Sequence, residues 1–217
     1  MKRMPLIILL MITSPVLFAQ KGNWYVGGVV GYSSSTDKTP GGFKTTTSSY
    51  AFGPEVGTFL KDNIQLGLYL GMSGDSQKDD NGDIYTSSAF SPTIYGRQFF
   101  KITDNFSAFG GLYLNISNGS TTNYNGGGNT TEQKYSGFGL RLGVGIAYAL
   151  SPRFTAVGQY GLLGYQSVSR KNNGNDAGTT TSFDFGVNTI GSSTLSQGNG
   201  SGSVFNIGLY YTLKKTN

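Results

Sequence analysis

Apolar and small residues alternate with a period of two over residues 136–154, SGFGLRLGVGIAYALSPRF. The even positions from Phe138 to Leu150 carry bulky apolar side chains, whereas the odd positions carry glycine, alanine and Arg141. This period is that of a β-strand with two different faces. A row of glycines is a poor water-facing surface, because glycine weakens a strand and offers nothing to solvate. The pattern therefore favours bulky residues facing lipid and small residues facing the inside of a narrow closed barrel.

The same alternation marks eight segments, and the connections between them are unequal in length. Short connections lie at 61–63, 101–105 and 151–153, whereas long hydrophilic loops are expected at 34–48, 74–85, 117–133 and 168–202. Short turns that alternate with long loops are typical of an outer-membrane barrel, with the turns in the periplasm. The sequence therefore predicts an all-β fold, an eight-stranded antiparallel up-and-down transmembrane β-barrel, with strands near 23–34, 48–60, 64–73, 86–100, 105–116, 134–150, 153–167 and 203–213.

Aromatic residues gather close to the short connections. Amphipathic aromatic rings are enriched where a membrane meets water. We therefore expect a girdle at the periplasmic interface, formed by Trp24, Phe59, Phe99, Phe100, Phe106, Tyr148, Phe154 and Tyr211. The phase of segment 153–167 is open, because Val157, Gln159 and Tyr160 do not continue one clear alternation.

The first twenty residues, MKRMPLIILLMITSPVLFAQ, have a basic start, an apolar stretch and a small residue at Ala19. These features indicate a secretory signal peptide at 1–20, cleaved after Ala19 or Gln20, followed by one barrel domain at 21–217. Beyond residue 20 no apolar run is long enough for a transmembrane helix. The chain has no cysteine, so neither a disulfide framework nor a lipid-modified cysteine is expected.

Composition favours a membrane protein. The chain has 34 glycines, 14 tyrosines and 14 phenylalanines, and only 12% of its residues are charged. So few charged residues are unusual for a protein whose surface faces water. The formal net charge is +5, and the basic residues are scattered along the chain instead of forming a stripe. This distribution argues against nucleic acid as a partner.

Several short motifs resemble the small outer-membrane β-barrel domain family of Gram-negative bacteria, a porin-type family related in architecture to the OmpA transmembrane domain. They are FGPEVGTFLKDNIQLG at 52–67, RQFF at 97–100 and GLLGY at 161–165. The resemblance implies a protein of the cell outer membrane. The chain ends shortly after the last predicted strand, so no periplasmic domain is expected to follow. The pattern Asn206-x-Gly208-x-x-Tyr211-x-Leu213 resembles the signal read by the barrel-assembly machinery, although it also fits a plain lipid-facing strand.

Polar residues on the inward face are the candidate site. Eight strands enclose room only for side chains or one small ligand, and a buried charge there has to be paired. Glu55 is the only acidic residue on these faces, so a Glu55–Arg97 pair with Arg141 close by is predicted. Either this network fills the barrel or it gates a narrow ion path. Its expected members are Glu55, Gln65, Tyr95, Arg97, Asn115, Arg141 and Gln159.

Metal and enzyme chemistry find little support in the sequence. The acidic segment at 75–83 lacks the glycine that a calcium loop needs at its sixth position, and Asn81-Gly82 fits a hairpin tip better. The chain has no histidine, the general base of the familiar barrel hydrolases. We therefore expect no metal, no cofactor and no catalysis.

Three functional classes compete. The favoured class is a structural or surface-interaction barrel with a filled lumen, whose loops would contact an outside partner that the sequence does not identify. Such a barrel is expected to be a monomer surrounded by outer-membrane lipid and lipopolysaccharide. The alternative is a narrow porin-like channel for ions or small solutes. A soluble lipocalin-like barrel fits less well, because its ligand cup requires large apolar residues on the inward face.

Overall fold

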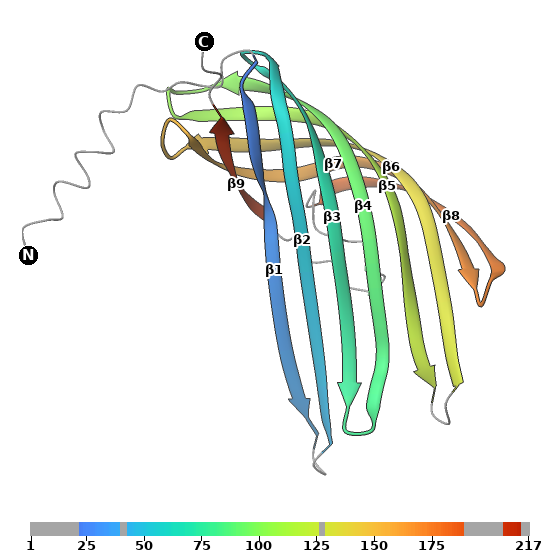
Figure 1. Ribbon diagram of the computed structural model, residues 1–217. Helices are drawn as coiled ribbons and strands as arrows, with labels where there is room; N and C mark the ends of the chain where they lie inside the picture. Colours follow the sequence, from blue (N-terminus) through green and yellow to red (C-terminus); the bar gives the residue numbers. More distant parts are fainter. Residues whose placement is uncertain (1–21, 40–42, 126–128, 189–205, 214–217) are drawn as a thin grey trace, which may run out of the picture.

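The computed structural model describes residues 22–39, 43–125, 129–188 and 206–213 (Figure 1). Expectations on the signal peptide at 1–20 lie outside these residues. None of the described residues forms a helix long and apolar enough to cross a membrane. They form antiparallel strands: β1 (Trp24–Lys38), β2 (Lys44–Lys61), β3 (Ile64–Asp79), β4 (Gly82–Lys101), β5 (Phe106–Asn125), β6 (Asn129–Ala149), β7 (Phe154–Asn172), β8 (Asn175–Asn188) and β9 (Asn206–Leu213).

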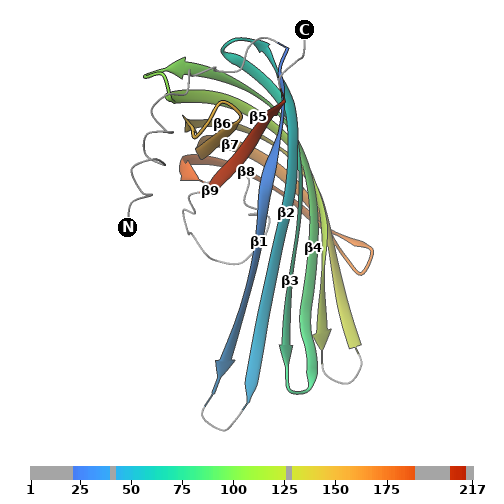
Figure 2. The ribbon, with the colours of Figure 1, turned by 60° about the vertical axis from the view of Figure 1, so that its left-hand side comes forward.

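Eight of these strands close into a ring, as predicted. Each strand from β1 to β7 pairs with the next, and β9 then pairs with both β7 and β1. Figure 2 shows β9 lying between these two strands at the end of the molecule that carries the short turns. That end is called proximal below, and the opposite end distal. The ring of β1 to β7 and β9 is the eight-stranded barrel.

β8 lies where the sequence predicts part of the loop at 168–202. It follows a turn at Asn173-Gly174 and pairs with the distal half of β7. Its Thr179 and Thr181 are the cross-strand partners of Ser169 and Ser167 of β7, and Ser169 Oγ and Thr179 Oγ1 form a 2.8 Å hydrogen bond. The half of β8 from Asn175 to Ser182 has no apolar alternation and therefore resembles a loop, and only Phe183, Phe185 and Val187 alternate with polar or small residues.

The other predicted long loops are wrong for the same reason. β2 to β6 extend far beyond the apolar rows, so only 39–43, 80–81 and 126–128 separate the strands at the distal end. Cross-strand hydroxyl contacts hold these extensions, as between Thr36 Oγ1 and Thr46 Oγ1 at 3.1 Å. Cross-strand Thr and Ser pairs stabilise sheets although both faces meet water. The short proximal connections and the hairpin tip beside Gly82 are confirmed.

The assignment of the two faces follows the predicted alternation. In β6 the large apolar side chains from Phe138 to Tyr148 are exposed on the outer face. The inward glycines make room for aromatic rings, since a Cβ at Gly67 would overlap the hydroxyl groups of Tyr25 and Tyr95. A Cβ at Gly145 would likewise overlap the ring of Phe109. The row of small residues is thus the steric complement of an aromatic lumen.

β7 changes phase in its middle. Leu142 of β6 pairs with Leu163, but Gly143 pairs with Gly161, so one residue of β7 is extra at this point. Val157 and Gln159 therefore face the lumen on one side of this bulge, and Gly164 faces it on the other. The bulge explains why one alternation does not fit the whole segment.

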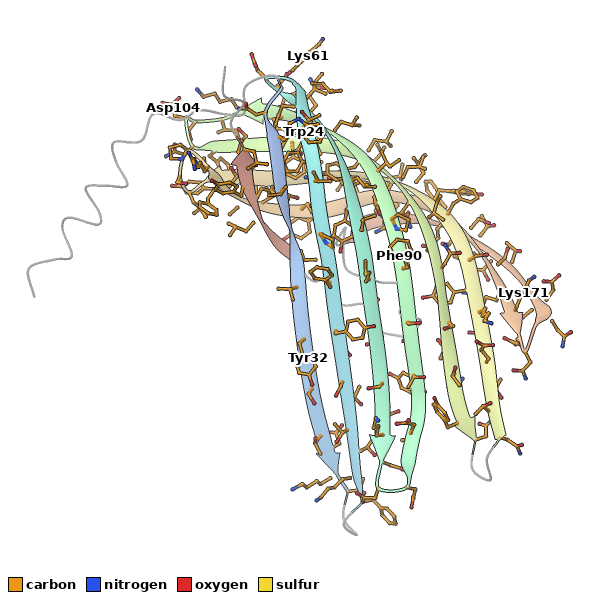
Figure 3. All side chains as sticks on the ribbon, viewed as in Figure 1. Trp24, Tyr32, Lys61, Phe90, Asp104 and Lys171 are labelled. Carbon is orange, nitrogen blue, oxygen red and sulfur yellow. The ribbon has the colours of Figure 1, made fainter. Side chains whose placement is uncertain are left out.

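The proximal outer face carries an aromatic girdle. Figure 3 shows Trp24 close to the short turns that include Lys61 and Asp104. The Phe154 and Tyr211 rings lie 5.1 Å apart, and Arg153 Nη1 donates a 2.8 Å hydrogen bond to Tyr211 Oη. Phe106 and Tyr148 are cross-strand partners. The exposed girdle residues include Trp24, Phe100, Tyr148 and Phe154.

Phe59 and Phe99 do not belong to this girdle, contrary to the prediction. Both rings face the lumen, where Phe59 lies 5.9 Å from Tyr25 and 6.0 Å from Phe99. Phe59 shares the inward parity of Glu55 in β2, and Phe99 shares that of Arg97 in β4. Nearness to a turn was thus the wrong guide, because the parity of the strand decides which face a ring occupies.

Candidate functional site in the barrel lumen

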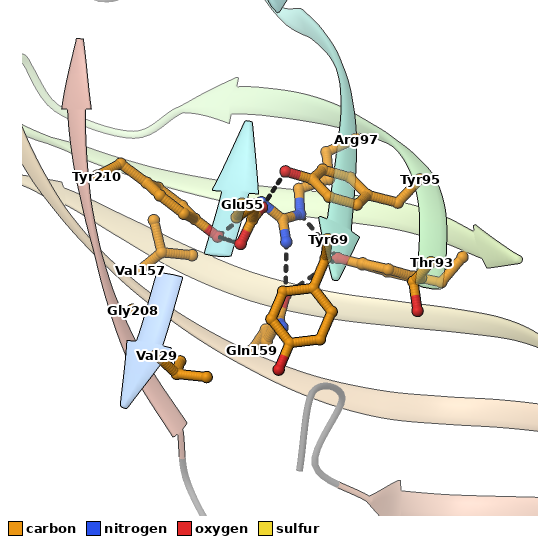
Figure 4. Close-up of a pocket in the computed structure, with 11 residues that line it drawn as sticks. Val29, Glu55, Tyr69, Thr93, Tyr95, Arg97, Val157, Gln159, Gly208 and Tyr210 are labelled. Atoms are coloured by element: carbon orange, nitrogen blue, oxygen red, sulfur yellow. Dashed lines mark hydrogen bonds and ion pairs between the residues drawn. The ribbon is translucent and has the colours of Figure 1, made fainter. Parts of the chain in front are cut away.

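Arg97 lies at the centre of the lumen. It projects inward from β4, and only 2% of its surface is exposed. Its Nε donates to Tyr113 Oη at 2.9 Å, and its Nη2 donates to Gln159 Oε1 at 2.9 Å (Figure 4). Its Nη1 lies 3.2 Å from Gln65 Oε1 and 3.0 Å from Tyr210 Oη. All three guanidinium nitrogens therefore have acceptors.

Glu55 is the counter-ion of Arg97. Its Oε1 lies 3.2 Å from Arg97 Nη1, and both side chains are buried. Tyr210 Oη donates to Glu55 Oε2 at 2.8 Å, and Tyr95 Oη donates to Oε1. Hydrogen bonds to both carboxylate oxygens, together with the ion pair, offset the high cost of a charge in a closed space.

Aromatic rings surround the ion pair. The Arg97 guanidinium carbon lies 4.0 Å from the centre of the Tyr95 ring, which stacks on Tyr113 at 5.5 Å. The hydroxyl group of Tyr25 contacts that of Tyr95, and the Tyr25 ring packs against Tyr210 at 5.3 Å. A cation on the face of an aromatic ring is attracted by the ring quadrupole. The rings therefore hold the guanidinium in addition to filling space.

The network crosses the whole barrel. Within the described part of the chain, residues from seven of the eight ring strands take part in these contacts. The participants are Tyr25 of β1, Glu55 of β2, Gln65 of β3, Tyr95 and Arg97 of β4, Tyr113 of β5, Gln159 of β7 and Tyr210 of β9.

Two small cavities lie on opposite sides of the network. The distal one includes Val29 and Thr93 in its lining, and the proximal one includes Phe59 and Pro152. Each has a volume of about 50 Å³, room for a few water molecules at most. Both are lined in part by Val157 and Tyr210.

Five of the seven residues expected in the network contact one another in the structure. The structure brings together Glu55, Gln65, Tyr95, Arg97 and Gln159. Arg141 is the cross-strand partner of Tyr113 on the lumen side and is less buried than Arg97, so Arg97 alone is the central cation. Asn115 is the cross-strand partner of Thr93 and Gly139, one step distal of the network.

Three network residues were not predicted, namely Tyr25, Tyr113 and Tyr210. Each stands at an inward position of its alternating row, and this parity is the signal that identifies them. The described residues contain no group of three or more His, Cys, Asp and Glu side chains arranged to hold a metal ion.

The residues of the predicted assembly signal lie on β9, the strand that closes the ring. Tyr211 pairs with Val26 and Phe154, and Leu213 pairs with Trp24. Leu213 is exposed on the outer face, whereas Gly208 pairs with Val157 on the lumen side. Asn206 is the cross-strand partner of Gln159.

Comparison with known proteins gives a match to one family. A family model described as an outer membrane protein beta-barrel domain matches residues 4–212. No curated protein matches the chain. Among solved structures, the outer membrane protein OprG from Pseudomonas aeruginosa is 16% identical, with a TM-score of 0.48, over 92% of this chain and 100% of that one. The translocator domain of the autotransporter NalP from Neisseria meningitidis is 13% identical, with a TM-score of 0.47, over 84% and 63% of the two chains.

Proposed function

The chain belongs to this family of outer-membrane β-barrel domains, and from that premise we propose that it is a plugged barrel with a structural or surface-interaction role. The observation that carries the proposal is the Arg97–Glu55 network. It spans the lumen from β2 to β9, and its buried charges have partners. We expect a lumen occupied in this way to block a continuous water path.

The plug also supports the wall. A short barrel has no core other than its lumen, so contacts across the lumen take the place of a hydrophobic core. The hydrogen bonds of Arg97 join strands that are not neighbours in the ring, such as β4 with β7 and β9. The proposed primary task of Arg97 and Glu55 is therefore to stabilise the barrel.

A narrow channel is the second candidate, and one observation favours it. The two cavities lie on either side of the network and share Val157 and Tyr210 in their linings, so a path between them would pass through the network. In that case the Glu55–Arg97 pair would act as a charged gate. No catalytic role is proposed for the site, because the chain has no histidine to serve as a general base.

Single-channel recording separates the two candidates. The protein, refolded into a planar bilayer, is expected to show no discrete openings if the lumen is plugged. The same recording on Glu55→Ala and on the control Asp83→Ala, an exposed acid at the distal end, identifies the source of any current. Discrete openings of the unmodified protein that change with Glu55→Ala, but not with Asp83→Ala, contradict the plug and establish the gate.

Biogenesis and surroundings follow from the same premise. We propose that residues 1–20 direct export, that β9 is read by the barrel-assembly machinery, and that the folded protein is a monomer in lipid. β9 suits this role because it closes the ring through both β1 and β7. The long distal strand extensions and their tips are the proposed surface for outside partners, because they extend beyond the apolar band.

A further inference from the structure

A groove of about 720 Å³ crosses the outer face of the barrel from β2 to β7. Most of its lining side chains share the outward parity of the lipid-facing rows. They lie in two neighbouring cross-strand rows: Met72, Phe90, Asn118, Ser136 and Ser169 are paired in sequence, as are Ser88, Ser120, Lys134 and Lys171. The groove therefore runs across the strands instead of along them.

The chemistry of the groove changes from one end to the other. Tyr50, Met72 and Phe90 make the end on β2 to β4 apolar, and each of these side chains is exposed. Hydroxyl and amide groups line the middle. Lys134 of β6 and Lys171 of β7 form the far end. An apolar end joined to a cationic end matches an amphiphile with an acidic head.

The height of the groove matches the surface of a membrane. In β6 the outward row from Tyr148 to Phe138 spans ten residues, which in a strand tilted by about 40° rise about 25 Å, the height of the apolar band of such barrels. Lys134 lies four residues further, about 10 Å above that edge. Phe90 ends the apolar row of β4, and Figure 3 shows Lys171 far towards the distal end. The groove thus leads from hydrocarbon into the headgroup layer.

The two lysines form an unusual pair. Lys134 and Lys171 stand directly opposite each other in the antiparallel register, on one face. Like charges in this position repel each other and destabilise a sheet. Lys134 Nζ lies 3.1 Å from Glu132 Oε2, and Lys171 Nζ lies 3.9 Å from Asp176 Oδ1. The lysine side chains nevertheless remain 62% and 60% exposed, so both ammonium groups are accessible to an anion that would relieve the repulsion.

We propose that this groove binds the phosphorylated lipid A portion of lipopolysaccharide. A phosphate group lies between Lys134 and Lys171, the sugar hydroxyls meet the Ser and Asn side chains, and an acyl chain lies on Phe90 and Met72. The proposal rests on the outer-membrane orientation with the short turns in the periplasm, and not on whether the lumen is plugged. Conductance and lipid binding are therefore separate readouts.

The test measures lipid A binding to the refolded protein in detergent. Diphosphorylated lipid A is titrated and the bound lipid is counted by native mass spectrometry, with fully dephosphorylated lipid A as the second probe. Loss of two lysines near a membrane anion is expected to weaken binding, so the Lys134→Gln/Lys171→Gln variant should bind diphosphorylated lipid A about 10- to 30-fold less tightly. The dephosphorylated lipid should bind as weakly to the unmodified protein.

The matched control is Lys44→Gln/Lys78→Gln, which removes two distal lysines that do not line the groove. It should keep the affinity of the unmodified protein. Heat-modifiable gel mobility verifies that each variant folds. Three results would each overturn the proposal: unchanged affinity in the Lys134/Lys171 variant, an equal loss in the control, or equally tight binding of the dephosphorylated lipid.

Discussion

Arg97 shows how one buried charge is tolerated in a narrow barrel. An isolated ion in such a space is very costly, and the cost falls only when geometry and hydrogen bonds satisfy it. Here Glu55 supplies the opposite charge, while Tyr113, Tyr210 and Gln159 accept the remaining donors. The tyrosine rings fit in the lumen because inward-facing glycines of the strands leave room for them. At the scale of single residues, the glycine row and the tyrosine rings are one packing arrangement.

That arrangement predicts that adding one methyl group to an inward glycine destabilises the protein, whereas adding it to an outward glycine does not. Gly67→Ala places a methyl group against the hydroxyls of Tyr25 and Tyr95, so the free energy of unfolding should fall by about 1–3 kcal/mol. Gly110→Ala is the control, since no atom lies within 4 Å of its added Cβ. Urea titration in lipid vesicles measures both variants. Equal stability of the two would show that the rings are not packed as described.

At the scale of strands, the period of two predicted the strands that carry apolar residues on one face and small residues on the other. It located parts of all eight ring strands and the proximal turns, and left open only the phase of the segment that forms β7. It did not find β8 or the distal extensions, because their Ser- and Thr-rich stretches carry no apolar alternation. The Glu55–Arg97 pair was predictable from parity and charge alone, whereas the choice of Arg97 over Arg141 depends on which strands face each other across the ring.

The placement of Phe59 tests this parity rule directly. Trp24 is the single tryptophan, and it lies on the outer face with 55% of its surface exposed. Lipids with brominated acyl chains should therefore quench its fluorescence strongly. In the Trp24→Phe background, Phe59→Trp puts the indole in the lumen, where quenching should be weak. Strong quenching at position 59 would place that side chain in lipid and overturn the assignment of faces in β2.

At the scale of the whole molecule, the proximal half is a closed ring of strands and the distal half is a set of long strands that extends from it. The charged network lies in this proximal half and joins strands that are not neighbours in the ring (Figure 4). The outer groove lies above that half and is lined by strands β2 to β7. The two proposed roles, plugging the lumen and binding lipid in the outer leaflet, therefore belong to two different surfaces.

The central claim is that one coupled charge network fills the lumen, and a double-mutant cycle tests it most directly. The free energies of unfolding of Glu55→Gln, Arg97→Met and the double variant are measured in vesicles by urea titration. Because removing either partner leaves the other buried without its counter-ion, the two effects should fall short of additivity by about 2 kcal/mol or more. Additivity within about 0.5 kcal/mol would show that Glu55 and Arg97 are not coupled, and would contradict the account.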